Sequence, residues 1–285
     1  MPTLTRTINA MRSRTLKTTA VSAAIALLMP LVASAHQGWI EPSKTVLAVG
    51  QWVTFDAGVS TLPFIKDHAP MRLDNLTITA PDGSVVQPEN ASTGKTRSVF
   101  DLQLSQAGTY KIAVINGNTM ASWDEQGQTK RWPPRGTPFT AEAFAKEVPA
   151  KAKDLKVSQM IGRLETYVTA GKPSDGALKP SGKGLELVPV TAFNDLYAGE
   201  SATFQLLLDG KPAKGIDVEV IADRTQYRDS VDALELKSDD KGQVSIAWPN
   251  PGVYLLTASV TDNKADKPAK ERRSSYAGVF EVLAP

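Results

Sequence analysis

The chain contains no cysteine among its 285 residues. Disulfides, cysteine nucleophiles, zinc–thiolate sites and cysteine-ligated iron–sulfur clusters are therefore excluded. The stability of the protein must come from its hydrophobic core instead. The 250 residues that follow position 35 are enough for one large or two ordinary domains.

Long apolar runs are nearly absent. The one candidate, residues 20–32, is shorter than the roughly 20 apolar residues that a transmembrane helix takes. Four basic residues precede it, and Ala33-Ser34-Ala35, a small-x-small peptidase motif, follows it. We therefore expect residues 1–35 to be a cleavable signal peptide, with the mature protein in the periplasm and not membrane-spanning; a retained signal anchor is the alternative. The four basic residues are Arg6, Arg12, Arg14 and Lys17.

Neither sign of charge is in large excess. The whole chain has 32 Lys and Arg against 30 Asp and Glu. Removing the four basic residues of the expected signal peptide leaves 28 against 30, a net charge of −2. Because no basic surplus remains to neutralise phosphates, nucleic acid is not an expected partner.

Histidine is scarce, and its placement suggests a metal site. The chain has two histidines, His36 and His68. Cleavage after Ala35 would make His36 the first residue, so that its α-amine and imidazole could chelate one metal ion. The imidazole of His68 would supply a third nitrogen, and divalent copper favours such nitrogen donors in a roughly square-planar arrangement. We expect the ion to be held by these two residues.

Further groups near His68 could complete this site. Asp56, Asp67 and Met71 are candidates for a fourth ligand or a supporting hydrogen bond. His68 is expected in a polar loop between strands, where sandwich proteins commonly present ligands. The alternative is that His36 only marks where the signal ends and that His68 is a solvated surface residue.

Short alternating strands separated by turns predict an all-β fold. We expect two immunoglobulin-like or transthyretin-like sandwiches, residues 36–118 and 185–285, joined by a connecting region, residues 119–184. Within and beside that region, residues 116–138 are expected to form an irregular loop and residues 170–184 a linker. Residues 156–168 are expected to form a strand. The expected helix, residues 140–148, has Thr140 as a cap and Pro149 as a stop.

The two sandwiches share a weak internal echo. In each, a strand is followed by a Gly turn and a second strand led by a tyrosine, Tyr110 or Tyr254. Sandwich domains use such a tyrosine to bond back to an upstream backbone group. We expect both tyrosines to do so, and expect residues 99–104 to pair with residues 110–115.

Catalytic motifs are missing. The sequence has no Gly-x-Ser-x-Gly elbow, no phosphate-binding Gly-x-x-x-x-Gly-Lys-Ser/Thr and no dinucleotide Gly-x-Gly-x-x-Gly. No pair of carboxylates stands out for acid–base chemistry. We expect no enzymatic activity, with a copper monooxygenase that uses the N-terminal chelate as the alternative.

Several segments in order resemble the domain-of-unknown-function 4198 family, which is similar to periplasmic portions of nickel-uptake transport components. The resemblance implies a periplasmic two-domain β-protein linked with metal uptake or TonB-dependent receptors, and it favours nickel or cobalt where the ligand chemistry favours copper. The second half also resembles transthyretin-like or carboxypeptidase-regulatory modules, which usually serve as structural or interaction domains. The segments are His36–Pro42, Gly50-Gln51, Gly58–Ser60, Leu185–Pro189, Ala198–Glu200, Asp209–Pro212, Ser238–Gly242 and Pro251–Tyr254.

A second function remains open alongside metal handling. The chain could be a non-metal interaction module that serves an outer-membrane TonB-dependent receptor or binds a carbohydrate or peptide. Aromatic and basic residues in the central region could bind such a partner, or the aromatics could simply pack the region into a cleft between the sandwiches. These residues are Trp123, Trp132, Phe139, Lys130, Arg131 and Arg135.

Overall fold

The computed structural model describes residues 37–134 and 136–285. The expected signal peptide, His36 and Arg135 lie outside the described residues. The expected all-β class is confirmed, because strands in three sheets make up most of the described chain, with one short α-helix. No helix within the described ranges has the length and apolarity needed to cross a membrane.

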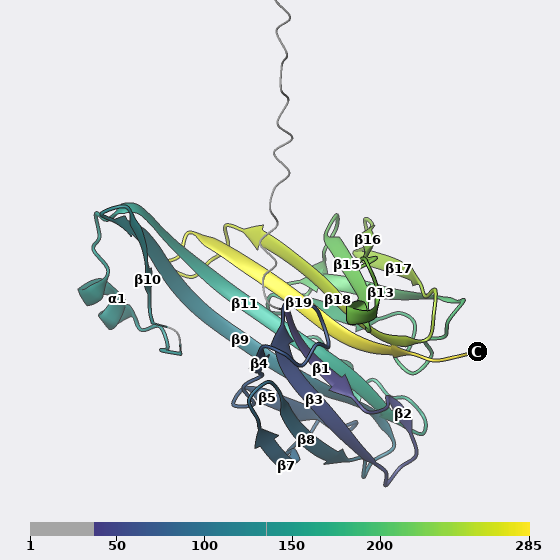
Figure 1. The fold of residues 1–285 in the computed structure, drawn as a ribbon. Coiled ribbons are helices and arrows are strands. Elements are labelled where there is room, and N and C mark those ends of the chain that lie inside the picture. Colours follow the sequence, from purple (N-terminus) through teal and green to yellow (C-terminus); the bar gives the residue numbers. More distant parts are fainter. Residues whose placement is uncertain (1–36, 135) are drawn as a thin grey trace, which may run out of the picture. The chain divides into compact units, whose positions relative to one another are not determined.

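A ten-stranded sheet forms the middle layer (Figure 1). Its order is β16-β15-β18-β19-β11-β9-β5-β6, with β10 paired to β9 and β2 paired to β11. At its centre, β11 runs parallel to β19 on one side and antiparallel to β9 on the other. The strands are β2 (Val46–Leu47), β5 (Leu76–Thr79), β6 (Val85–Val86), β9 (Gly108–Glu125), β10 (Gln128–Trp132), β11 (Lys153–Ala170), β15 (Asp217–Ala222), β16 (Leu234–Lys237), β18 (Gly252–Asp262) and β19 (Glu271–Val282).

Two smaller sheets cover the opposite faces of this layer. One has the order β1-β3-β8-β7, with β4 also paired to β3, and the other has the order β12-β13-β14, with β17 also paired to β13. The strands of the first are β1 (Gln37–Pro42), β3 (Trp52–Ser60), β4 (Ala69–Pro70), β7 (Glu89–Thr93) and β8 (Ser98–Gln103). Those of the second are β12 (Leu185–Pro189), β13 (Ser201–Leu208), β14 (Lys211–Pro212) and β17 (Gln243–Ala247).

The central strands contribute to two hydrophobic cores. Successive residues of a strand point to opposite faces of a sheet. Leu164 and Val168 of β11 therefore pack in the core under β1, β3 and β8, whereas Tyr167 packs in the core under β12, β13 and β17. Leu255 and Leu256 of β18 divide between the same two cores. This is why β11 is buried on both faces over its second half.

The far ends of β9 and β11 build a third, smaller apolar cluster with β10 and the helix α1 (Ala141–Glu147). The expected helix is confirmed, and the Thr140 hydroxyl accepts a hydrogen bond from the Ala143 amide as its cap. The ring of Trp132 lies 5.7 Å from those of Phe139 and Phe144, and its Nε1 donates to Glu147. These aromatics therefore pack, as one interpretation expected, but they pack against α1 in a cluster of their own and not in a cleft between the sandwiches.

The irregular loop expected over residues 116–138 is wrong as far as residue 132, where all but Gln126 and Gly127 lie in strands. The strand β9 continues to Glu125 and returns as β10, with Gln126 and Gly127 between them. Exposed polar residues and Gly117 gave this segment a weak strand pattern. Pairing with β11 on one side and β10 on the other nevertheless fixes it as extended chain. The strand expected at residues 156–168 is confirmed as part of β11.

The expected pairing of residues 99–104 with residues 110–115 is also wrong. The strand β8 pairs with β3 and β7, and β9 belongs to the central sheet, so the turn between them carries the chain from one layer to the other. Gly108 makes this possible, because it has φ +135 and a Cβ there would lie 2.5 Å from Pro81 Cβ. The expected tyrosine contacts are confirmed. The Tyr110 hydroxyl accepts from the Gln106 amide at 2.8 Å. The Tyr254 hydroxyl donates to the Asn250 carbonyl at 2.7 Å.

The domain boundaries at residues 36–118, 119–184 and 185–285 stay a prediction. The central sheet contains strands from all three ranges, because β9, β11 and β19 lie next to one another in it. The expected linker, residues 170–184, forms the connection from β11 to β12 and holds one short 3₁₀ turn, η1 (Gly176–Leu178).

Candidate functional site

The first sheet places His68 and the start of β1 at the same end. Gln37 of β1 pairs with Ser60 at the end of β3. On the other side of β3, Val59 pairs with Ala69, the residue that directly follows His68. Adjacent strands are about 4.8 Å apart, so two spacings separate the beginning of β1 from the beginning of β4, about 10 Å. The chain entry at residue 37 and the loop that carries His68 therefore lie beside each other.

The loop before β4, residues 61–68, is anchored by one lysine. Lys66 Nζ lies 2.8 Å from Asp56 and 3.6 Å from Glu41, and it stands 5.9 Å from the centre of the Trp39 ring. Trp39 is fully buried and donates from Nε1 to the Ser60 hydroxyl at 2.9 Å. Burial raises the pKa of Glu41, and the Lys66 ammonium partly offsets that rise. These contacts fix the path of the loop across the outer face of β1 and β3.

The described candidate ligands differ in their exposure and in their existing partners. His68 and Asp67 are exposed beside the start of β4. Asp56 is held by Lys66 and by Arg97, whose Nε lies 3.3 Å from it, so its carboxylate already has two cationic partners. Met71 is buried, and a Cβ on Gly38 would lie 3.1 Å from its methyl carbon.

The histidine pair itself is only half described. His36 lies outside the described residues, one position before Gln37. Within residues 37–134 and 136–285, no group of three or more His, Cys, Asp or Glu side chains could hold a metal ion.

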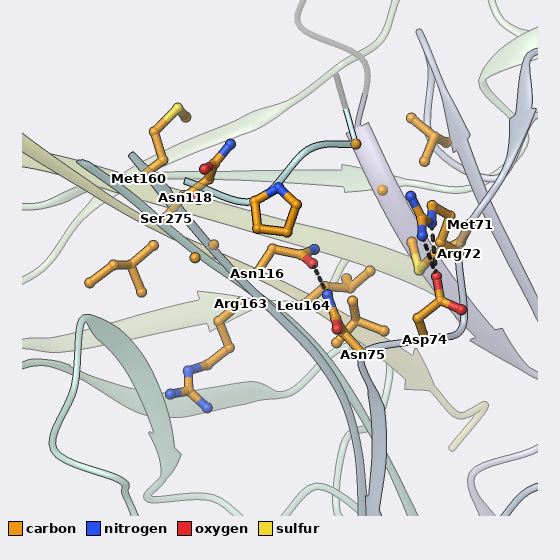
Figure 2. A pocket seen from close by; sticks show the side chains of 18 of the residues that line it. Met71, Arg72, Asp74, Asn75, Asn116, Asn118, Met160, Arg163, Leu164 and Ser275 are labelled. Carbon is orange, nitrogen blue, oxygen red and sulfur yellow. Dashed lines mark hydrogen bonds and ion pairs between the residues drawn. The ribbon is translucent and has the colours of Figure 1, made fainter. Parts of the chain in front are cut away.

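A pocket of about 1000 Å³ opens on the central sheet next to the start of β1 (Figure 2). Its floor is made by three rows of residues across β9, β11 and β19, each row set by the strand register. The middle row is Asn116, Gly162 and Ser275. Because Gly162 has no side chain, the floor is lowest at this residue. The flanking rows are Val114, Leu164 and Ala277 on one side, and Asn118 and Met160 on the other.

Two segments wall this pocket. One runs from Met71 to Asn75, and the other is the stretch from Gly136 to Phe139. Asn75 Nδ2 donates to Asn116 Oδ1 at 2.8 Å, which links a wall to the floor. Gly38 also lines the pocket, so the pocket and the expected N-terminal site are neighbours.

Sequence reasoning missed this pocket. The one local signal was Gly162, an isolated glycine inside a strand pattern, which often marks a place where another group approaches closely. The row that makes the floor depends on β11 pairing with β19, more than 100 residues later, and no local pattern reveals that pairing.

The opposite face of β11 carries a buried ionic cluster. Arg163 Nη1 lies 3.1 Å from Glu165, and Arg163 Nη2 lies 3.3 Å from Glu186, with all three side chains at most 5% exposed. Glu186 also accepts from the amides of Ser181 and Gly182 at 2.7 and 2.8 Å. This cluster ties the 179–184 loop to the sheet, which explains charged groups in the core without any ligand.

Two tyrosines complete the cluster. The Tyr167 hydroxyl donates to Glu165 at 2.5 Å and lies 3.4 Å from the Tyr276 hydroxyl. Burial raises the pKa of both tyrosines well above the usual value, and the Glu165 charge adds to that rise. Both phenolic hydroxyls therefore stay protonated in the folded protein at neutral pH.

Comparison with known proteins identifies a family. The sequence model described as "Domain of unknown function (DUF4198)" matches residues 33–262. The chain belongs to this family. The DUF4198 match covers β1 to β18 and both faces of β11, so it includes the pocket floor on β9 and β11 and the His68 loop. No curated protein sequence matches the chain.

Solved structures show only distant similarity. A trypsin-activated α2-macroglobulin from Escherichia coli is 13% identical with a TM-score of 0.23, over 86% of this chain and 15% of that chain. The D0-D1 domain of intimin is 11% identical with a TM-score of 0.20, over 86% of this chain and 99% of that chain. An amphioxus IgVJ-C2 molecule is 13% identical with a TM-score of 0.20, over 84% and 99% of the two chains. TM-scores this low carry no argument about the site.

Proposed function

We propose that this DUF4198 protein is a periplasmic accessory protein that binds a transition-metal ion as cargo for uptake or handling. The ion is held by the α-amine and imidazole of His36, exposed by signal cleavage, and by the imidazole of His68. The observation that carries the proposal is the register of β1, β3 and β4, which brings the start of β1 and the His68 loop to one end of a sheet.

Covalent geometry extends this observation to His36. Consecutive Cα atoms are about 3.8 Å apart, so His36 cannot lie far from Gln37. The anchored 61–68 loop then presents His68 from a fixed path, which reduces the ordering that metal binding would require. Among the further candidates, Met71 lies beside Gly38 and Asp67 beside His68, whereas Asp56 is engaged by Lys66 and Arg97.

Two arguments about the identity of the metal point to different ions. An all-nitrogen site binds divalent copper more tightly than nickel or cobalt, as any such site does in the usual affinity order. The resemblance to nickel-uptake components inferred from the sequence would favour nickel or cobalt as the cargo. The proposed partner is a transport component or outer-membrane receptor that takes over the ion, and no catalytic role is included.

Copper titration of correctly processed protein tests the proposal. The parent must begin at His36, as verified by mass spectrometry. We expect one tight site per chain, and we expect His68→Ala and a form extended by Ser34-Ala35 each to lose at least about tenfold in affinity, about 1.4 kcal/mol. Lys95→Ala, an exposed change in the β7–β8 turn, is the matched control. Equal binding by the parent, His68→Ala and the extended form would refute the proposal.

A further inference from the structure

We propose that the pocket on the central sheet binds a short uncharged oligosaccharide, independently of the metal. The pocket volume of about 1000 Å³ far exceeds what a single ion needs, and lies at the upper end of the range of ligand pockets. Its chemistry, described next, distinguishes a sugar from an ionic or peptide ligand.

The floor offers hydrogen bonds that nothing else uses. Asn75 donates to Asn116 at 2.8 Å, and neither the Asn116 amide NH₂ nor the Asn75 side-chain oxygen has a further hydrogen-bond partner among the described residues. Asn118 is exposed on the same strand, and Ser275 adds a hydroxyl on the far side of Gly162. Neighbouring amide donors and acceptors suit sugar hydroxyls, each of which can both donate and accept.

Some apolar surface lies beside these polar groups. Met160 is 40% exposed at one end of the floor, whereas Val114, Leu164 and Met71 line the pocket with exposed fractions of only 4, 7 and 6%. Pyranose rings present such alternating character, with hydroxyl groups at the rim and C–H groups on the face. Small-ligand sites commonly combine apolar lining with a few convergent polar groups.

The charged groups of the described lining already have partners of opposite sign. Arg72 holds Asp74 through two hydrogen bonds of 2.9 and 2.7 Å. The guanidinium of Arg163 points away from Asn116 in Figure 2, and its ionic partners are Glu165 and Glu186 on the other face of the sheet. An uncharged ligand therefore fits the described residues better than a phosphate, a carboxylate or an ammonium.

Two of the three floor strands offer no free edge to a peptide. Extended peptides commonly bind by adding a strand to a free sheet edge. The floor strands β11 and β19 each have a neighbour on both sides at this point, whereas β9 from Ile115 to Met120 pairs with β11 alone among the described strands. Over β11 and β19, recognition therefore depends on side chains that read hydroxyl groups.

Calorimetric titration of the metal-free processed protein tests the inference. The probes are maltotriose, cellotriose, laminaritriose, xylotriose, mannotriose and chitotriose, each titrated first with a chelator present. We expect at least one to bind with a dissociation constant of about 1 mM or lower. A second titration without chelator and with saturating copper should give the same affinity, which separates this site from the metal site.

Variants locate the binding. Gly162→Val fills the floor without a backbone clash, since its Cβ would meet Ser275 Oγ at an ordinary 3.5 Å, and Asn116→Ala removes an amide. Each should weaken binding at least about tenfold. Ile115→Ala, which changes an exposed residue that does not line the pocket, should leave affinity unchanged. Failure of all six sugars to bind, or undiminished binding by folded Gly162→Val, would overturn the inference.

Discussion

The two faces of β11 show how one strand can serve structure on one side and recognition on the other. Arg163, Glu165 and Tyr167 point into the core under β12 and β13, where they bond to one another and to the 179–184 loop. Gly162 and Met160 point the other way, to an open floor beside amides with spare hydrogen-bonding capacity. The charged face of β11 is therefore structural, and the proposed ligand site lies on the other face, where polar side chains in an open pocket have unused hydrogen-bonding groups.

Removing Arg163 should have the largest effect on stability. Arg163→Met leaves the carboxylates of Glu165 and Glu186 buried without their cation. Breaking a buried pair in this way costs about 3–5 kcal/mol. Denaturant unfolding measures the loss. Arg72→Met is the control, because both members of the Arg72–Asp74 pair are more than 60% exposed and should contribute about 0–1 kcal/mol. Equal effects of the two changes would contradict the structural assignment of this face.

The ion pairs of Arg272 with Asp209 and Asp262 should make the free energy of unfolding sensitive to acid. Arg272 lies 2.7 Å from Asp209 and also contacts Asp262, and these hydrogen bonds lower the pKa of both carboxyls. Because the folded values lie below the unfolded value of about 3.9, this stabilisation is present above that pH and is lost as the pH falls through the folded values.

The Arg272→Met change isolates this contribution. It should cost about 2 kcal/mol at pH 7, the usual magnitude for hydrogen bonds to charged groups, and less at pH 3. Unfolding free energies at the two pH values measure the difference. An equal loss at both pH values would show that packing of the Arg272 side chain, not ionisation of Asp209 and Asp262, is responsible.

Alkaline pH probes the buried tyrosines. Burial raises the pKa of Tyr167 and Tyr276, so their contribution to stability is complete below the unfolded value of about 10 and is lost as the pH rises above it. We expect two of the six tyrosines to ionise only as the protein unfolds, seen as a delayed step in tyrosinate absorbance. Tyr167→Phe should remove one of these two delayed ionisations. Early ionisation of all six in folded protein would be inconsistent with a closed cluster.

Filling the pocket floor should have the smallest effect on stability. Gly162→Val places a strand-favouring residue where the Cβ makes only ordinary contacts. Because glycine weakens strands, we expect a change between zero and a gain of about 1 kcal/mol, measured by thermal unfolding. A loss above about 2 kcal/mol would mean that the glycine is required for packing, and the floor would then be a structural feature and not a ligand site.

Local chemistry allowed much of the fold to be predicted. Thr140 predicted the start of α1, the alternation of residues 156–168 predicted part of β11, and Tyr110 and Tyr254 predicted their backbone contacts. These features depend on residues a few positions apart. Residues 116–125 became strand through distant partners, and the 99–104 segment entered a different sheet from its neighbour, so sequence patterning failed for both.

The two candidate sites also differ in whether nearby residues or distant strand pairing define them. Two histidines and a cleavage motif were visible in the sequence, and the register of β1, β3 and β4 then supplied a reason for them to meet. The pocket needed the parallel pairing of β11 with β19, which aligns Gly162 with Ser275. Only the folded sheet brings these two residues together with Asn116.

Electron paramagnetic resonance of copper-loaded protein that begins at His36 tests the metal site most directly. Three nitrogen donors should appear in the spectrum, and His68→Ala should reduce them to two, because the start of β1 and the His68 loop share one end of the sheet. A nitrogen pattern unchanged by His68→Ala would contradict the shared site.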